Sequence, residues 1–445
     1  MKERHGFSGK LGFVLAAAGS SVGLGNIWRF PYLAAQYGGG LFVLIYVILV
    51  VTIGSTLMTM EITIGRRGQI DVYDCYRNLD KRFTFLGVFG IIIPFFIASY
   101  YSVVGGWIIK YLVDLVSGHI EQAATQGYFS NYIATPVAPI VYHALFLLLS
   151  LLILLLGVKR GIEKSNKILM PLLLILSIIV SIKSITMPGG LEGVKFYLIP
   201  DFSNFSFQSI LAAIGQVFYS LSLAMGIMVT YGSYMKKDVE IKQSVKMAEL
   251  FDTAVAILGG LMIVPAVYAF SGGNPEAINA GPGLLFETLP SVFRQMPLGS
   301  FFGALFFLLV LFAALTSMIS LMEVCIAFLI DKFHMKRINA TLLVSLAIFV
   351  VGIPSSLGFG VWKNVTIFGM SIFDFLDYAA NTLFMPLIAI ATCVFVGYFW
   401  GVKNIFAEAE LSGPFKNKKY YTIMVRYVAP ICIGAVWLTT IFHIG

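Results

Sequence analysis

The sequence predicts an all-α membrane protein with eleven transmembrane helices. Hydrophobic residues make up 58% of its 445 residues and charged residues only 12%, about half the charged share of a soluble domain. The apolar residues come in long blocks, and a bilayer core about 30 Å thick needs roughly 20 apolar residues per helix. The expected spans are about 10–37, 41–66, 84–113, 139–157, 165–187, 208–235, 242–271, 299–330, 338–353, 367–398 and 421–443.

Lys and Arg are unevenly distributed over the loops between these spans. The amino terminus and the loops near 66–83, 158–167, 236–246, 331–337 and 399–420 hold 23 of them, and the opposite loops and span ends hold five. Basic loops mark the cytoplasmic side. We therefore expect a multi-pass protein of the cytoplasmic (inner) membrane with its amino terminus inside and its carboxyl terminus outside. The formal charge of +8 is then a topology signal, and no nucleic-acid partner is expected.

The first and sixth spans are interrupted near their middle. The first contains Gly19, Gly23 and Gly25, and the sixth contains Ser220, Ser222 and Gly226. Each interior Gly lowers helix propensity by about 1 kcal/mol relative to Ala. Two interpretations remain open: broken helices that form a binding site at the midplane of an inverted-repeat transporter, or small-residue faces for helix packing.

Several segments carry a family resemblance that covers nearly the whole chain. They are "AAAGSSVGLGNIWRFPYLAAQYGGGLFVLIY", "MEITIGRR", "ASYYSVVGGW", "GQVFYSLSLAMGIMVTYGSYMKKD", "GPGLLFETLP" and "FFLLVLFAALTSMISLMEVCIAFLID". The sequence resembles the neurotransmitter:sodium symporter family, and its bacterial amino-acid transporter branch in particular. The resemblance implies one transporter domain over 1–445, built from two five-helix repeats of opposite orientation (spans 1–5, about 10–187, and spans 6–10, about 208–398). Helices 1 and 6 would be unwound, and an additional helix would follow at about 421–443.

The resemblance also implies two sodium ions beside the substrate. The first would bind the Ser21 carbonyl, Asn26, Ser220 and Asp252, and the substrate carboxylate would complete its shell. The second would bind the following residues: Gly19, Val22, Ala313, Thr316 and Ser317. All of these supply oxygen, which a hard cation requires. From its pattern alone, "LTS" would indicate hydroxyls bonded back to the helix.

The implied substrate site lies between the two broken helices. The substrate carboxylate would meet Leu24, Gly25 and the Tyr101 hydroxyl, and the ammonium would meet carbonyls near Ser21, Tyr219 and Ser222. The expected substrate-binding set is Ser21, Leu24, Gly25, Ile97, Tyr101, Tyr219, Ser220, Ser222, Met225, Ser317 and Leu321. Its side-chain pocket carries no charge, and Gly23 stands where monoamine-carrying relatives place an Asp. Both features favour a neutral hydrophobic, possibly aromatic, L-amino acid.

Two gates are implied in the same way. Arg29 with Asp377, beside Gln216, resembles an outer ion pair, although "DFLD" also allows Asp374. The expected inner latch consists of Arg4, Ser233, Tyr234 and Asp331. Glu61 is an acid within the second span, so it is expected to be functional or tightly bonded, and its expected role is to hold unwound backbone.

The expected function is therefore sodium-coupled import of that amino acid by alternating access. Asp252 stands where many relatives have Asn, and its charge suggests that chloride is not required. A sodium-dependent sensor on a transporter fold, or a transporter of another small zwitterion, remains the alternative. An enzyme is not expected, because the five histidines are dispersed without metal-ligand spacing. No filter pattern of a channel is found, and the sequence does not indicate an oligomeric state.

Overall fold

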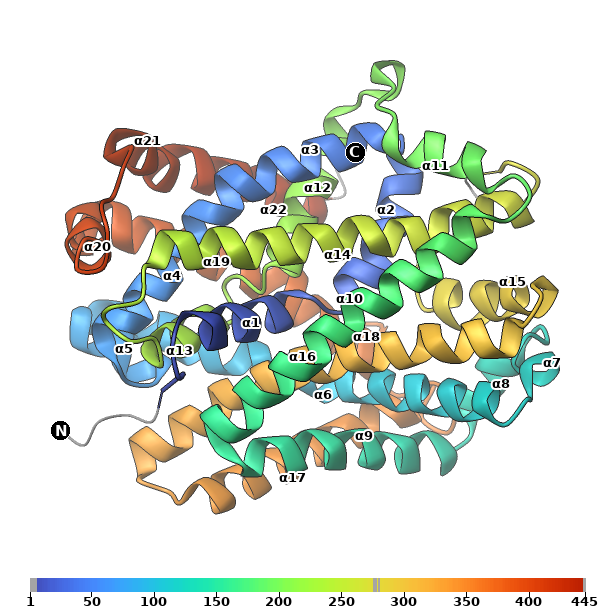
Figure 1. Ribbon diagram of the computed structural model, residues 1–445. Coiled ribbons are helices and arrows are strands. Elements are labelled where there is room, and N and C mark those ends of the chain that lie inside the picture. Colours follow the sequence, from blue (N-terminus) through green and yellow to red (C-terminus); the bar gives the residue numbers. More distant parts are fainter. Residues whose placement is uncertain (1–5, 275–277, 279–280, 443–445) are drawn as a thin grey trace.

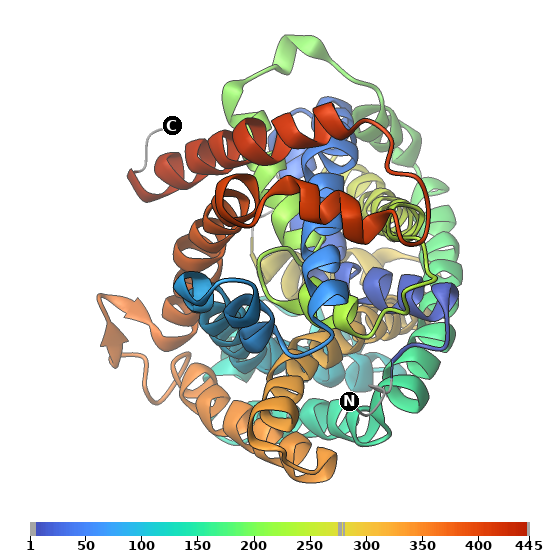
Figure 2. The ribbon, with the colours of Figure 1, turned by 90° about the vertical axis from the view of Figure 1, so that its left-hand side faces the viewer.

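The computed structural model describes residues 6–274, 278 and 281–442, and within them the fold is nearly all-helical, as predicted. The long helices run side by side and form one bundle (Figure 1, Figure 2). In the described chain, nine helical segments are long and apolar enough to cross a membrane: Gly40–Gly68 (α3, η2, α4), Lys81–Val116 (η3, α6), Ala138–Leu155 (α9), Val158–Ile185 (η4, α10), Ile241–Phe270 (α14), Gly299–Phe333 (α16), Arg337–Leu357 (α17), Ile372–Trp400 (α18, η8, α19, η9) and Lys418–Phe442 (α21, η10, α22).

Two further predicted spans are broken. The first consists of α1 (Lys10–Ser21) and a second part, η1 (Gly25–Arg29) with α2 (Phe30–Gln36), bent by 51° at the break. The sixth consists of α12 (Phe207–Ser220) and α13 (Ile227–Ser233), separated by residues 221–226. The interruptions at Gly and Ser therefore mark breaks in the helices and not only packing faces.

Shorter elements connect the spans. They are α5 (Val72–Leu79), α7 (Ile120–Ala123), α8 (Tyr128–Ala134), α11 (Gly190–Leu198), η5 (Phe202–Asn204), η7 (Leu284–Thr288), α15 (Leu289–Gln295) and α20 (Val402–Ala409). Two short strands, β1 (Thr366–Ile367) and β2 (Met370–Ser371), pair antiparallel before α18. The sequence analysis did not predict this hairpin, because each strand has only two residues.

Burial distinguishes the centre of the bundle from its edge. In α16, 83% of the most apolar window is buried, whereas in the last span, Lys418–Phe442, only 17% is buried. The eighth predicted span therefore forms the core against which the broken helices pack, and the last span lies at the periphery.

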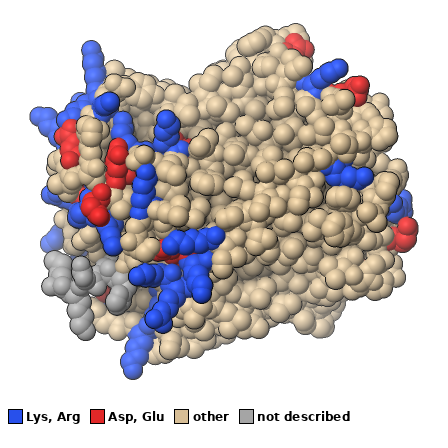
Figure 3. Space-filling view, viewed as in Figure 1, with Lys and Arg blue, Asp and Glu red and all other residues tan. Residues whose placement is uncertain are grey.

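The charged side chains gather at the two ends of the bundle. In Figure 3, Lys and Arg are concentrated at the left-hand end, where Figure 1 places α5, α20 and α21, and the broad middle has almost no charge. An uncharged belt between polar ends is what a bilayer requires.

Candidate functional site

The breaks in the first and sixth spans face each other around a small cavity of about 40 Å³. Ten of the eleven predicted substrate-binding residues line this cavity: Ser21, Leu24, Gly25, Ile97, Tyr101, Tyr219, Ser222, Met225, Ser317 and Leu321. Ser220 lies beside it and bonds to Asp252 instead. Ser20, Gly23 and Ile227 complete the lining, so the wall has no charged side chain.

The break in the sixth span is held in an unusual backbone conformation. Ser222 and Ala224 have positive φ angles of 53° and 58°, and Gly226 has 70°. A left-handed conformation costs a residue with a Cβ roughly 1–2 kcal/mol, so contacts must compensate. Ser222 Oγ donates to the carbonyl of Ser20 (3.0 Å), and Glu61 Oε1 accepts from the Ala224 N–H (2.7 Å). Glu61 therefore contacts the unwound backbone, which is the contact that its predicted role requires.

The residues expected to hold the first sodium ion form a buried polar cluster. Asn26 Nδ2 donates to Ser220 Oγ (3.1 Å) and Asp252 Oδ1 (2.8 Å), and Ser220 Oγ donates to both Asp252 carboxylate oxygens (2.8 and 2.9 Å). Tyr46, which the sequence analysis did not single out, donates from its hydroxyl to Asp252 Oδ2 (2.9 Å). Ser21, whose carbonyl was the other predicted ligand, lines the small cavity, and no contact between Ser21 and this cluster occurs among the described residues.

The residues expected to hold the second ion also converge. Thr316 Oγ1 donates to the carbonyls of Ala313 (3.0 Å) and Val22 (3.5 Å), and Ser317 Oγ donates to the Val22 carbonyl (3.3 Å). Gly19 lies beside them, because a Cβ at Gly19 would lie 3.4 Å from Thr316 Cβ. Hydroxyls and a carbonyl of α16 therefore meet the carbonyl of Val22, the residue directly after α1. This second set consists of oxygen, so it suits a hard monovalent cation. In the first set, Asn26 turns its nitrogen toward Ser220 and Asp252, and its Oδ1 accepts from the Gly23 N–H (3.2 Å).

Tyr101 provides a test of the substrate site. Its hydroxyl is buried, lies beside Leu24 and Ser317, and has no hydrogen-bond partner in the described chain. We expect Tyr101→Phe to weaken substrate binding by about 1.5–3 kcal/mol, because it removes a hydrogen bond to a charged carboxylate. Equilibrium binding of the transported amino acid by the purified variant measures this effect. Thermal unfolding serves as the control for folding, and unchanged affinity in a well-folded variant would make Tyr101 a packing residue.

A larger cavity of about 420 Å³, here called the vestibule, adjoins the small one and shares Leu24, Tyr101 and Tyr219 with it. Arg29, Asp374 and Asp377 all line the vestibule. The expected outer ion pair is not formed, since no ion pair of Arg29 occurs among the described residues. Its guanidinium lies 5.3 Å from the Tyr219 ring centroid, a cation–π arrangement.

The two candidate acids differ in their surroundings. Asp377 accepts from Asn381 Nδ2 (2.8 Å), which also donates to the Tyr100 hydroxyl. Asp374 accepts from Ser371 Oγ (2.7 Å) at the start of α18. Gln216 lies against the break in the first span and donates to the Gly25 carbonyl (3.0 Å). An open arrangement of the vestibule fits these separate bonds.

At the opposite end of the bundle, the segment before α1 packs against α13 and the residue that follows it. The Phe7 N–H donates to the Tyr234 carbonyl (3.1 Å), and the Phe7 ring packs against the rings of Phe13, Tyr231 and Tyr234. Ser233 donates to the Thr230 carbonyl within α13. Arg4 lies outside the described residues, so the predicted latch between Arg4 and Asp331 stays a prediction.

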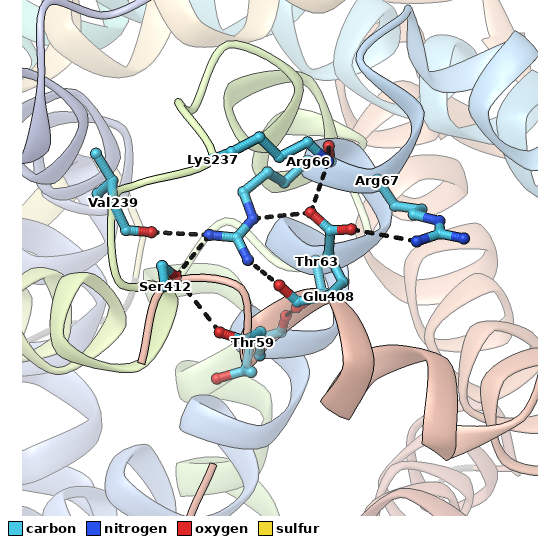
Figure 4. A network of polar contacts seen from close by, with 9 residues as sticks. Thr59, Thr63, Arg66, Arg67, Lys237, Val239, Glu408 and Ser412 are labelled. Atoms are coloured by element: carbon cyan, nitrogen blue, oxygen red, sulfur yellow. Dashed lines mark hydrogen bonds and ion pairs between the residues drawn. The ribbon is translucent and has the colours of Figure 1, made fainter. Parts of the chain in front are cut away.

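The sequence analysis missed two buried ionic networks near the same end. In the first, Arg337 makes a bidentate pair with Glu323 (2.6 and 3.0 Å), which also accepts from the Tyr234 hydroxyl. The second is shown in Figure 4, where Arg66 Nε meets Glu408 Oε1 at 3.1 Å and Lys237 Nζ meets the same oxygen at 2.7 Å. Arg66 and Glu408 are 342 positions apart, whereas Glu323 and Arg337 are 14 apart but lie on two different helices, α16 and α17. Neither spacing gives a signal of pairing.

The fold and the site together define a class: a multi-pass membrane transporter with a binding cavity between two broken helices. Comparison with known proteins gives the family. The model of the sodium:neurotransmitter symporter family matches residues 4–131 and 130–444. The chain belongs to this family and, like its relatives, is a sodium-dependent symporter and not an enzyme.

Individual relatives match over almost their full length. A sodium-dependent transporter of Haemophilus influenzae is 38% identical, covering 99% of both chains. YhdH, a sodium-dependent transporter of Bacillus subtilis, is 38% identical, covering 98% of this chain and 97% of YhdH. The crystal structure of MhsT in complex with L-phenylalanine superposes with a TM-score of 0.87 at 40% identity, covering 98% of this chain and 99% of MhsT.

Proposed function

We propose that the protein imports a neutral hydrophobic L-amino acid together with two sodium ions and without chloride. The observation that carries the proposal is the small cavity between the broken spans, whose lining has no charged side chain. An amino acid that brings its own carboxylate and ammonium can bind there to backbone groups, hydroxyls and sodium. The bound L-phenylalanine of MhsT supports an aromatic substrate.

The lining also favours large side chains. Ile97, Tyr219, Met225 and Leu321 offer apolar surface, and Met adapts to different shapes. A Cβ at Gly23 would lie 2.6 Å from Ser317 Oγ, so this position has no room for an acidic side chain without movement of Ser317. The substrate must therefore supply its own carboxylate, which argues against a monoamine.

The proposed orientation follows the charge distribution. The protein would lie in the inner membrane with the basic end of Figure 3 facing the cytoplasm. Its amino terminus would then be inside and its carboxyl terminus outside. The vestibule would then open to the outside, and the end where Phe7 meets Tyr234 would face inward. The division into repeats at about 10–187 and 208–398 belongs to the same proposal.

Uptake of labelled amino acids into proteoliposomes tests this function. One charge crossing 100 mV is worth roughly 2.3 kcal/mol. Two sodium ions with a zwitterion would therefore gain roughly 4.6 kcal/mol, which supports about 10³-fold accumulation. We expect uptake to need sodium and to rise with an inside-negative potential, and Phe, Tyr, Trp or Leu to compete best. Equal initial rates in sodium and choline would contradict the coupling, and best competition by Gly, Glu or Lys would contradict the pocket assignment.

A sensor on the same fold differs in one measurable way. It would bind the amino acid in a sodium-dependent manner, but it would not accumulate it against a gradient. Binding without accumulation in the same proteoliposomes would therefore favour the sensor.

A further inference from the structure

Asn166 carries a buried side-chain oxygen whose bonding is incomplete. The residue lies at the start of α10 and is fully buried. Its Nδ2 donates to the Ile162 carbonyl (2.8 Å), but its Oδ1 has no hydrogen-bond partner among the described residues. Buried polar atoms are rarely left unpaired, so this oxygen needs an explanation.

The orientation of this amide is set by its bond. If the amide were turned over, the oxygen would face the Ile162 carbonyl, and two acceptors would oppose each other. The nitrogen therefore faces Ile162, and the oxygen faces the first span.

The oxygen lies beside the residues expected to bind the second sodium ion. A methyl group placed on Gly19 would overlap Asn166 Oδ1, and the same methyl would lie 3.4 Å from Thr316 Cβ. Asn166 therefore reaches the place where α1 and α16 meet only because residue 19 has no side chain. An amide oxygen is a ligand of the same kind as the carbonyls and hydroxyls already there.

The nearby charges do not satisfy this oxygen. Glu163, one turn before Asn166, accepts from the Ser8 N–H (2.8 Å) and from Lys167 Nζ (2.6 Å). The Lys167 ammonium is thus bonded to Glu163 on the partly exposed side of α10. With Lys167 engaged by Glu163, the proposed second sodium ion is the cation available to Asn166 Oδ1.

We propose that Asn166 supplies an additional oxygen donor, from the fifth span, to the second sodium site. This inference rests on the proposed function, because it assumes the second ion. It assigns to Asn166 a role that the transferred ligand set of Gly19, Val22, Ala313, Thr316 and Ser317 does not include. The ion would then join three helices, α1, α10 and α16, and not two.

Two substitutions and one matched control test the proposal. Asn166→Leu keeps the branching of the side chain and removes both its oxygen and its nitrogen, whereas Asn166→Asp keeps the oxygen, adds a negative charge and likewise gives up the bond to the Ile162 carbonyl. Ser177→Ala is the control, because Ser177 is a buried polar residue on the same helix whose hydroxyl donates to the Leu173 carbonyl (2.8 Å). The purified full-length proteins are titrated with sodium chloride against choline chloride at constant ionic strength. Melting temperature and equilibrium binding of radioactive sodium are recorded without any amino acid.

Binding of an ion to the folded state stabilises it by RT ln(1 + [Na⁺]/Kd), so the melting temperature rises with sodium concentration once that concentration exceeds Kd. We expect Asn166→Leu to raise the sodium concentration for half-saturation of one of the two sites by about tenfold, on the scale of one lost contact to a charged group. Asn166→Asp should lower the sodium concentration for half-saturation. Ser177→Ala should leave that concentration unchanged, even if the melting temperature of this variant falls. Half-saturation of Asn166→Leu within about twofold of the wild type overturns the inference.

The result remains decisive if Asn166→Leu does not fold. Asn166→Asp must then bind sodium more tightly than the wild type, and unchanged or weaker binding overturns the inference. If the wild type itself shows no sodium-dependent stabilisation or binding, the proposed ion coupling fails. Those two failures are distinguishable, because the first requires a sodium-responsive wild type.

Discussion

Substitution of Glu408 by Ala is expected to destabilise the folded protein by about 3–5 kcal/mol, the cost of leaving a buried charge without its partner. Arg66 and Glu408 are both fully buried, and Glu408 Oε1 also meets Lys237. Without this carboxylate, Arg66, Arg67 and Lys237 form an uncompensated cluster of three positive charges (Figure 4). The free energy of unfolding in detergent, from denaturant titration, measures the loss.

Glu410→Ala is the matched control for this experiment. Glu410 pairs with Lys418 at 2.6 Å just after α20, but both side chains are exposed, at 39% and 48%. Exposed pairs contribute about 0–1 kcal/mol, so this variant should be close to the wild type. A loss for Glu408→Ala no larger than that for Glu410→Ala would show that the Val239 carbonyl and Ser412, which accept from Arg66, suffice to hold it.

The second large effect concerns Asp252 and chloride. Its carboxylate is fully buried and accepts from Asn26, Ser220 and Tyr46, and no ion pair joins it to Lys or Arg in the described residues. A charge at this depth is costly unless it meets a cation, and the proposed first sodium ion is that cation. The human taurine transporter, whose name describes it as sodium- and chloride-dependent, is 25% identical over 97% of this chain and 77% of that protein. In the present protein, a fixed carboxylate beside the ion would take the place of such a chloride.

We therefore expect wild-type sodium-driven uptake to be equal in chloride and in gluconate. Asp252→Asn keeps the shape and most hydrogen bonds but loses the charge. It should weaken apparent sodium affinity by about tenfold or more, the scale of one contact to a charged group, or create a chloride requirement. Uptake by the wild type that collapses in gluconate would mean that Asp252 does not replace the anion. Uptake by Asp252→Asn that matches the wild type in both media would indicate a neutral, protonated Asp252.

The sequence predicted most of the fold because its strongest signals are local. A long apolar block indicates a membrane helix by itself, and Gly clusters indicate a break without knowledge of the partner. The exact ends of the helices could not be predicted from the sequence. The β1–β2 hairpin could not be predicted either, because a two-residue strand has no periodicity. The six-residue break at 221–226 could be located, but not the left-handed φ angles of Ser222 and Ala224.

The residues of the site also divide into those with a local sequence signal and those without one. Those that line the cavity belong to motifs, such as "SYYSVVGGW", that carry the family resemblance. Asn166 and Glu408 belong to no such motif. Tyr46 ends the first of these segments, but nothing in the segment indicates its partner. All three meet their distant neighbours only through folding, across 206 positions for the bond from Tyr46 to Asp252. Contacts of this kind depend on the packing of helices, which single-sequence spacing does not encode.

The separation of α1 from the rest of the first span has a consequence for how the transport cycle is driven. A half-helix tied to α16 by an ion is held by a removable cross-link, whose strength depends on the ion's concentration as RT ln[Na⁺]. When the site faces a compartment with tenfold less sodium, the cross-link weakens by about 1.4 kcal/mol, although no protein contact has changed. In the proposed cycle, the same half-helix would therefore be fastened on the outer side and loosened on the inner side by mass action alone.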